Sequence, residues 1–219
     1  MPRLLFEKSG NAIWISHLDL MRLFQRAFKR AGYPLTHTNG YNPRPSVSIA
    51  LPLSVGIESQ CELLDFDLDV PCNSLEKLKA DLNNALTEGV IIHDVMAESR
   101  KIRDIAYLST KIILHYDNGV PQNACNTIAD LFRSGCLIVT KKTKRGFDDQ
   151  DILPMIKTFE IRKAGKTQLE ILAVHCCQNP TLNPTQIVTA ICKYAPDLTP
   201  DACDYRRMEV YDCNNNIFR

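Results

Sequence analysis

Basic side chains gather within the first 46 residues, where they could bind a chain of phosphates. This stretch holds seven lysines and arginines against two carboxylates, whereas residues 47–106 hold five against eleven. From about His17 to Ala31, apolar residues recur at helical spacing, and four cations fall within a wedge of about 100° on the opposite side of the predicted helix. These four are Arg22, Arg26, Lys29 and Arg30. Such a ridge suits a nucleic-acid backbone, because each neutralised phosphate releases counterions. A solvated face of an ordinary amphipathic helix would show the same pattern.

A proline-rich segment follows this helix, with the sequence Asn39-Gly40-Tyr41-Asn42-Pro43-Arg44-Pro45. Proline fixes its own backbone and restricts the residue before it, so Asn42 and Arg44 are both pushed toward extended conformations. We therefore expect a stiff loop that presents Arg44 and Tyr41 with little entropy left to lose. An arginine and an aromatic ring held in this way suit recognition of a phosphate or an unstacked base. A plain connection between a helix and a strand is the simpler alternative.

A third group of cations lies in the second half of the chain, at Lys141, Lys142, Lys144 and Arg145. These side chains could clasp nucleic acid. Acidic residues follow immediately within 148–151, so a loop that neutralises its own charge is equally consistent with the sequence.

Residues for acid–base chemistry are sparse. In a stand-alone RNA-processing or RNA-modifying enzyme, His17 would act as the acid or base, with Arg44 and Glu58 nearby. A structural role for a histidine at the start of a helix is the simpler alternative. The sequence contains no Gly-x-Gly and no Gly-x-x-x-x-Gly-Lys-Ser/Thr, which argues against a nucleotide loop, and no Cys-x-x-Cys. On a strand, at most two of His175, Cys176 and Cys177 share a face, so we expect no metal site and no cofactor.

The elements that must position these residues occur twice in the same order. The first half predicts a strand, a helix, two strands, a helix and a strand: Arg3–Lys8, about His17 to Ala31, Val47–Leu51, Cys61–Leu68, a helix capped by Asn73 or Ser74 and stopped by Gly89, and Val90–Met96. The second half predicts Leu108–Tyr116, helix Ala124–Arg133, Cys136–Thr140, Thr158–Arg162, Gln168–Val174, a helix from Asn183 through Tyr194, and Arg206–Tyr211. Two consecutive β-α-β-β-α-β units indicate an α+β protein of two ferredoxin-like halves with antiparallel sheets. The two domains are expected at residues 1–98 and 107–219.

Composition places the chain among ordinary globular proteins. Hydrophobic residues make up 45% and charged residues 23%. No run of 18 apolar residues is present, and Glu7 interrupts the N-terminus before any apolar stretch of signal-peptide length. We therefore expect a cytoplasmic protein with no membrane contact. The nine scattered cysteines fit free thiols in a reducing compartment.

Two motifs resemble those of a known family. The first comprises Ile15–Arg22, Arg26 and Arg30–Gly32, and the second comprises Gly40–Pro45, Ser48–Leu53, Val55–Ser59 and Glu62–Asp65. They resemble the radical-SAM-linked protein family, a bacterial domain of unknown function. Its members are encoded beside, or fused to, a radical S-adenosylmethionine protein with a cobalamin-binding-type domain. Members often carry Asp-Ile-Arg-Pro in the second half, whereas this chain has Asp151-Ile152-Leu153-Pro154, which weakens the case for a charged site there.

The resemblance, together with the basic segments, implies an accessory subunit. It would bind an RNA substrate and present it to a separate radical S-adenosylmethionine enzyme, because the Cys-x-x-x-Cys-x-x-Cys spacing of such enzymes is missing here. A stand-alone enzyme that uses His17 is one alternative. A protein-interaction module whose basic ridge meets an acidic partner is the other.

Overall fold

Antiparallel strands and four α-helices make up the described part of the chain, so the expected α+β class with antiparallel sheets is confirmed. The structure is a computed structural model, and it describes residues 1–143 and 146–219. It divides into unit 1, Met1–Asp104 with Ile217–Arg219, and unit 2, Ile105–Asn216. The sequence placed residues 217–219 in the second half, whereas the structure groups them with unit 1. None of the helices in these residues is long and apolar enough to cross a membrane.

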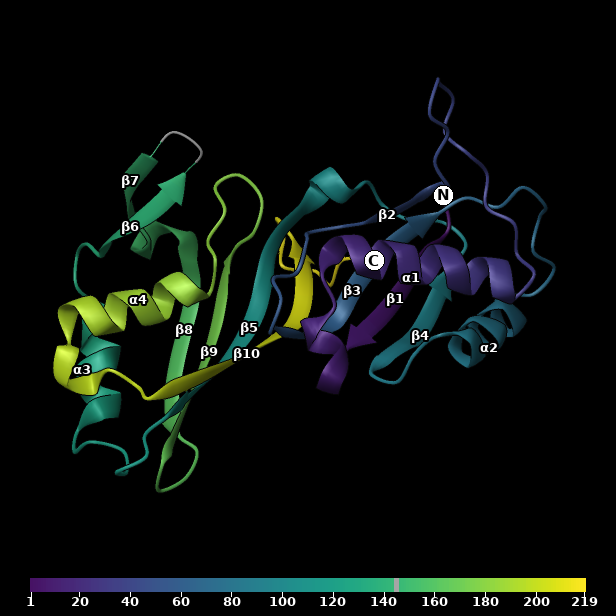
Figure 1. Ribbon diagram of the computed structural model, residues 1–219. Helices are drawn as coiled ribbons and strands as arrows, with labels where there is room; N and C mark the ends of the chain where they lie inside the picture. Colours follow the sequence, from purple (N-terminus) through teal and green to yellow (C-terminus); the bar gives the residue numbers. More distant parts are fainter. Residues whose placement is uncertain (144–145) are drawn as a thin grey trace. The chain divides into compact units, whose positions relative to one another are not determined.

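Unit 1 places two helices on one face of an antiparallel sheet (Figure 1). Its strands lie in the order β4-β1-β3-β2. The elements, in chain order, are β1 (Arg3–Lys8), α1 (His17–Arg30), β2 (Val47–Ile49), β3 (Glu58–Phe66), α2 (Leu75–Ala85) and β4 (Val90–Met96). Between β1 and α1 lies a 3-10 turn, Gly10–Trp14.

The ends and the rotation of α1 follow from its sequence. The Ser16 side chain accepts a hydrogen bond from the backbone N–H of Asp19 at 3.2 Å, which caps the first turn. Gly32 ends the helix in the left-handed region at φ +80°. Phe24 and Phe28 are fully buried, and their rings contact Phe6 and Phe66 of the sheet at centroid distances of 4.8 and 5.0 Å. The helix therefore packs with its apolar side on the sheet and its cations toward solvent.

A buried arginine explains why the last residues belong to unit 1. Arg3 is 1% exposed and forms a bidentate ion pair with Asp65, at 2.6 Å from Nε and 3.0 Å from Nη2. Its Nη2 also donates to the backbone carbonyl of Arg100 at 2.9 Å. The guanidinium groups of Arg3 and Arg100 lie 5.2 and 5.0 Å from the ring centroid of Phe218. These contacts hold the C-terminal residues against the sheet of unit 1.

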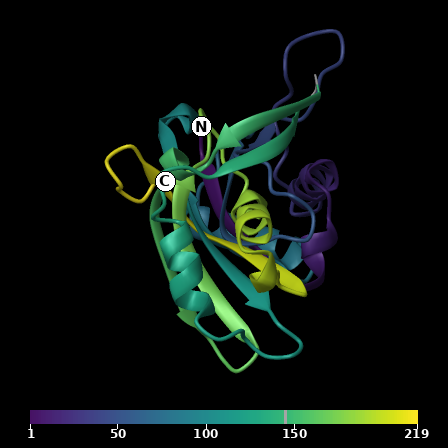
Figure 2. The ribbon, with the colours of Figure 1, turned by 90° about the vertical axis from the view of Figure 1, so that its left-hand side faces the viewer.

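Unit 2 contains four strands in the order β10-β5-β9-β8 and a separate hairpin, in which β6 pairs with β7 alone. Figure 2 shows α3 and α4 beside these strands and the hairpin projecting from them. The elements are β5 (Ile105–His115), α3 (Ala124–Leu131), β6 (Ile138–Thr143), β7 (Gly146–Asp151), β8 (Ile156–Lys163), β9 (Gln168–Cys176), α4 (Thr185–Tyr194) and β10 (Ala202–Asp212).

The hairpin departs from the sequence prediction. The sequence indicated one strand, Cys136–Thr140, and then a polar stretch without structure. In the structure β6 and β7 pair antiparallel along their whole lengths, and the Thr140 hydroxyl donates to the Asp149 carboxylate at 2.7 Å. A hydrophobic pattern misses this hairpin because polar pairs across the two strands stabilise it.

The His/Cys cluster at the end of β9 has a structural explanation. His175 is fully buried, and its Nδ1 donates to the carbonyl of Cys176 at 3.1 Å while Nε2 accepts from the Thr110 hydroxyl at 2.9 Å. Burial lowers the pKa of His175 to about 4, and nearby Arg207 acts in the same direction. The ring is therefore neutral in the folded protein at neutral pH, with both nitrogens satisfied.

This depressed pKa predicts a loss of stability in mild acid. An unfolded histidine titrates near pH 6.5, so the contribution of His175 is complete above that pH and is lost as the pH falls toward 4. We expect the free energy of unfolding to fall by about 2 kcal/mol between pH 8 and pH 5 from this residue alone. Urea titrations of the wild type and His175→Gln at both pH values measure it. Equal pH dependence in the two proteins would contradict this assignment.

Candidate nucleic-acid interface

The cations on the exposed side of α1 differ in whether an acidic side chain pairs with them. Arg22 is paired with Asp19 at 2.9 Å, and Asp19 also accepts from the Ser16 hydroxyl at 2.7 Å. The Ser16 hydrogen bond, followed by the Arg22 guanidinium, holds the pKa of Asp19 below its usual range. Arg26 and Lys29 are exposed, and within the described part of the chain neither forms an ion pair. The positive potential of this helix is therefore strongest in its C-terminal half.

Arg30 has a structural partner. Its guanidinium donates to the backbone carbonyl of Ala85, the last residue of α2. Carbonyl groups at a helix end lack partners within the helix, and a basic side chain satisfies one of them. The ridge of four cations predicted from the sequence thus divides into Arg30, which joins two helices, and the other three, which face solvent.

The proline-rich loop is closed at its base by backbone pairing. His37 and Pro45 form an isolated antiparallel bridge, and the N–H of Thr38 donates to the carbonyl of Arg44 at 2.9 Å. The N–H of Arg44 in turn donates to the Thr38 hydroxyl at 3.0 Å. Arg44 is thus fixed at its backbone from both sides while its side chain remains exposed. At the far end of the loop, Tyr41 is 100% exposed.

Two adjoining grooves lie between α1 and this loop. The first has a volume of about 780 Å³ and is lined by His17, Arg22 and Arg44, among other residues. The second, of about 620 Å³, includes Arg26 and Lys29. Gln25 and Pro45 line both. We call the two together the α1 groove.

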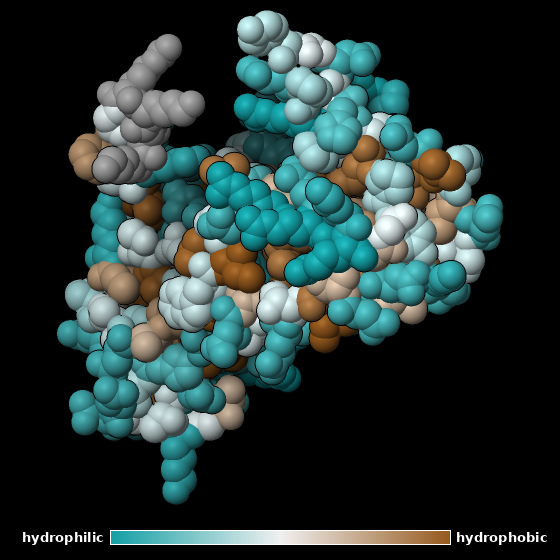
Figure 3. All heavy atoms as spheres, turned by 45° about the vertical axis from the view of Figure 1, so that its right-hand side comes forward, coloured by the Kyte–Doolittle hydropathy of each residue, from teal (hydrophilic) through white to brown (hydrophobic). Residues whose placement is uncertain are grey.

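In Figure 3, hydrophilic side chains form a band over α1, and the loop projects above it. Three exposed cations of the helix and the loop arginine therefore line two grooves that share Gln25 and Pro45. The histidine predicted as an acid or base shares the first groove with Arg44.

The other predicted site residues lie elsewhere or project away from the hollow. Glu58 begins β3, seven residues before Asp65. Asp65 pairs with Ser48, which lines the first groove. Seven residues of a strand span about 23 Å, so Glu58 lies far from this part of the groove wall. The structure thus does not place Glu58 in the groove with His17 and Arg44, as the enzyme hypothesis had expected. Tyr41 and Asn42 are exposed in the loop and line neither groove.

The third basic group belongs to the hairpin of unit 2. Lys141 lies on β6 directly opposite Asp148 of β7, which fits the self-neutralising alternative. The backbone of Lys142 continues the same strand, opposite Phe147. Lys144 and Arg145 fall outside the described residues.

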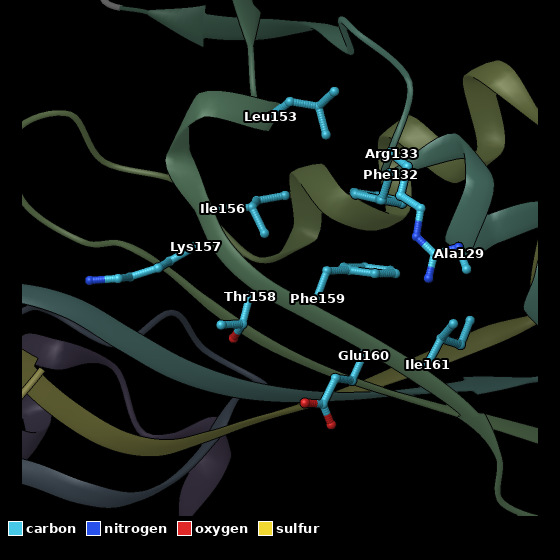
Figure 4. A pocket seen from close by; sticks show the side chains of 10 residues that line it. All are labelled: Ala129, Phe132, Arg133, Leu153, Ile156, Lys157, Thr158, Phe159, Glu160 and Ile161. Atoms are coloured by element: carbon cyan, nitrogen blue, oxygen red, sulfur yellow. The ribbon is translucent and has the colours of Figure 1, made fainter.

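Unit 2 has a hollow of its own, between α3 and β8, with a volume of about 560 Å³ (Figure 4). The rings of Phe132 and Phe159 stack within it, with centroids 4.1 Å apart and planes 7° from parallel. At its edge Arg133 pairs with Asp130 at 3.4 Å. Its ten lining residues include none of the predicted site residues. The α1 groove is therefore the better candidate for a charged ligand.

We find no candidate metal site among the residues that the structure describes. No group of three or more histidine, cysteine, aspartate or glutamate side chains there is placed to hold a metal ion.

Comparison with known proteins assigns a family. Residues 2–184 match the model of a family described as "Uncharacterized protein conserved in bacteria (DUF2344)". The chain belongs to this family. The sequence analysis expected membership of a bacterial family of unknown function, and this match confirms that part of the expectation. No curated protein matches the DUF2344 chain in sequence.

Two solved structures match the DUF2344 chain. A chain of the "Crystal Structure of a Cbf5-Nop10-Gar1 Complex" matches with a TM-score of 0.53 and 9% identity, covering 95% of this chain. The match covers 48% of that chain, so the DUF2344 chain spans about half its length. A protein from Galdieria sulphuraria, described as unknown, matches at 12% identity over 94% of this chain and 96% of the other, with a TM-score of 0.27. The first likeness concerns the fold alone.

Sequence reasoning missed several groove residues, notably Tyr33, His37 and Asp69. They approach Arg26 because an isolated bridge joins Leu35 to Leu68, which brings together two segments far apart in the sequence. No local periodicity records such a contact.

The separate role of Arg30 predicts a difference in stability between neighbouring cations. Arg30→Ala removes the bond to the α2 carbonyl, and we expect it to lower the free energy of unfolding by about 0.5–1 kcal/mol. Lys29→Ala removes an exposed charge from the same turn and should leave stability nearly unchanged. Urea unfolding of both variants compares them. Equal stability of the two would show that the Arg30 contact contributes nothing.

Proposed function

We propose that this chain is an accessory subunit that binds a single-stranded RNA and presents it to a separate radical S-adenosylmethionine enzyme. One observation carries the RNA-binding part: Arg44 and the exposed cations of α1, which come from two different segments, line two adjoining grooves that share Gln25 and Pro45. Cations arranged along an open path favour a chain of phosphates over a single small anion. Arg22 and Lys29 are seven residues apart on the helix, about 10 Å, which is room for more than one phosphate.

The partner is inferred from the resemblance and the position of its motifs. The motif Ile15–Arg22 opens α1, and the motif Gly40–Pro45 forms the projecting loop, so both motifs contribute residues to the groove. A family defined by its link to a radical enzyme would keep the binding groove in this subunit and the iron–sulfur cluster in the other.

The stand-alone enzyme remains the second candidate, and one observation favours it. His17 lines the same groove as Arg44, where it could meet a bound RNA. In that case the purified protein alone would cleave or modify the RNA, whereas the accessory role requires the RNA to be recovered unchanged.

The finer description of the fold is also a proposal. We infer that each unit is a ferredoxin-like half. The strand orders β4-β1-β3-β2 and β10-β5-β9-β8 support it, because they correspond position by position when the hairpin β6–β7 is set aside as an insertion.

Salt dependence tests the groove directly. Arg26→Ala with Lys29→Ala should weaken binding of a single-stranded RNA and reduce the slope of log Kd against log salt by about 1.4, or 0.7 for each lost phosphate contact. The matched control, Lys77→Ala with Arg133→Ala, removes the same charge from exposed positions outside the groove. Fluorescence anisotropy at several salt concentrations measures both. The ridge has no role in binding if its double variant keeps the wild-type slope.

The loop makes a different prediction, because its arginine is preorganised. Arg44→Lys keeps the charge but loses the planar fork that holds a phosphate bidentately, so it should cost nearly as much affinity as Arg44→Ala, about 1–3 kcal/mol. Lys29→Arg, on the helix, should cost far less, since charge alone matters there. The same anisotropy assay compares the three variants. Wild-type affinity for Arg44→Lys would reduce the loop to one more positive charge.

A further inference from the structure

Both parts of the α1 groove expose mostly apolar surface, and the second part differs from the first by a carboxylate, Asp69, in its lining. Its surface is mainly apolar, with Pro34, Leu35 and Pro45 among its lining residues, while Arg26 and Lys29 approach from the helix. Its volume of about 620 Å³ falls in the range of small-molecule sites. A bare phosphate needs no apolar surface, so this part of the groove suits a ligand with a flat, partly apolar body.

Hydrogen bonds to α2 and to neighbouring backbone groups hold the walls of this pocket in place. The Tyr33 hydroxyl donates to the Asp81 carboxylate of α2 at 2.8 Å, and the Tyr33 N–H donates to the carbonyl of Phe28 at 2.9 Å. The N–H of Asp69 donates to the carbonyl of Pro34 at 2.9 Å, beside the bridge between Leu35 and Leu68. The pocket is therefore formed before any ligand arrives, which limits the entropy lost on binding.

One carboxylate lies in this otherwise basic pocket. Asp69 is exposed, and over residues 1–143 and 146–219 its side chain has neither an ion pair nor a hydrogen bond. A carboxylate repels phosphate and accepts hydrogen bonds only, so it must face donors. Guanine has two adjacent donors on its Watson–Crick edge, N1–H and the N2 amino group, which match the two oxygens of a carboxylate. Cytosine, adenine and uracil each offer only one donor group on that edge.

We propose, resting on the RNA binding proposed above, that this pocket takes one unstacked guanine base of a single-stranded RNA, with Asp69 accepting from its N1–H and N2 amino group. Tyr33 and His37 provide rings against which a base can stack. Arg26 and Lys29 hold the adjoining phosphates. Unstacked bases read at their edges are the usual basis of sequence-specific RNA recognition.

The experiment compares three RNA 12-mers by fluorescence anisotropy: oligouridine, the same chain with one central guanosine, and the same chain with inosine at that position. Inosine lacks the N2 amino group and so has a single donor left. For the wild type we expect the guanosine chain to bind on the order of tenfold more tightly than oligouridine, with inosine in between. Asp69→Asn should abolish the preference for the guanosine chain over oligouridine. The control Glu76→Gln, an exposed carboxylate on α2, should keep the preference.

The outcomes separate the two proposals. If the wild type binds all three chains equally and with strong salt dependence, the guanine pocket is wrong and the RNA-binding groove stands. A guanosine preference that survives in Asp69→Asn, or that inosine fully reproduces, also overturns the pocket. If none of the chains binds, the proposed function fails, and the pocket fails with it.

Discussion

The packing of Phe24 and Phe28 against the sheet of unit 1 is the contact on which the exposure of the α1 cations depends. It fixes the rotation of α1 about its own axis, and a turn of one residue, about 100°, would carry cations toward the core. Burying an unpaired arginine is far more costly than burying a phenylalanine ring is favourable, so only one rotation is stable. The cations therefore face solvent as a consequence of the core. An ordinary, unstrained α-helical backbone is enough to expose these cations.

The loop and the pocket depend in turn on pairing between distant segments. Bridges at Leu35–Leu68 and His37–Pro45 bring the chain after α1 back along the helix, so that one wall of the groove comes from a loop and the other from a helix. Backbone hydrogen bonds in this wall fix the main chain from which exposed side chains such as Arg44 and Asp69 extend. Cations and apolar surface therefore occur together in both parts of the groove.

Local features of the sequence were sufficient to predict α1, its cap at Ser16, its end at Gly32 and the antiparallel α+β class, because these features have regular periods or short-range signals. Three features could not be predicted from local sequence patterns. The bond from Arg30 to α2, the packing of Phe218 against Arg3 and the placement of Asp69 beside Arg26 all join residues far apart in the chain. The hairpin β6–β7 was missed for another reason: its polar pairs lack a hydrophobic alternation. Whether a cation is held by another part of the protein or is available to a ligand depends on its tertiary contacts, which local sequence patterns do not record.

Ultraviolet crosslinking of the protein to RNA in cells tests the central claim most directly. The crosslinked RNA is sequenced, the crosslinked peptides are mapped by mass spectrometry, and co-purified proteins are identified. The account predicts single-stranded RNA attached to peptides from α1 and from residues 33–48, together with a radical S-adenosylmethionine enzyme. The absence of RNA, or crosslinks confined to unit 2, would contradict it.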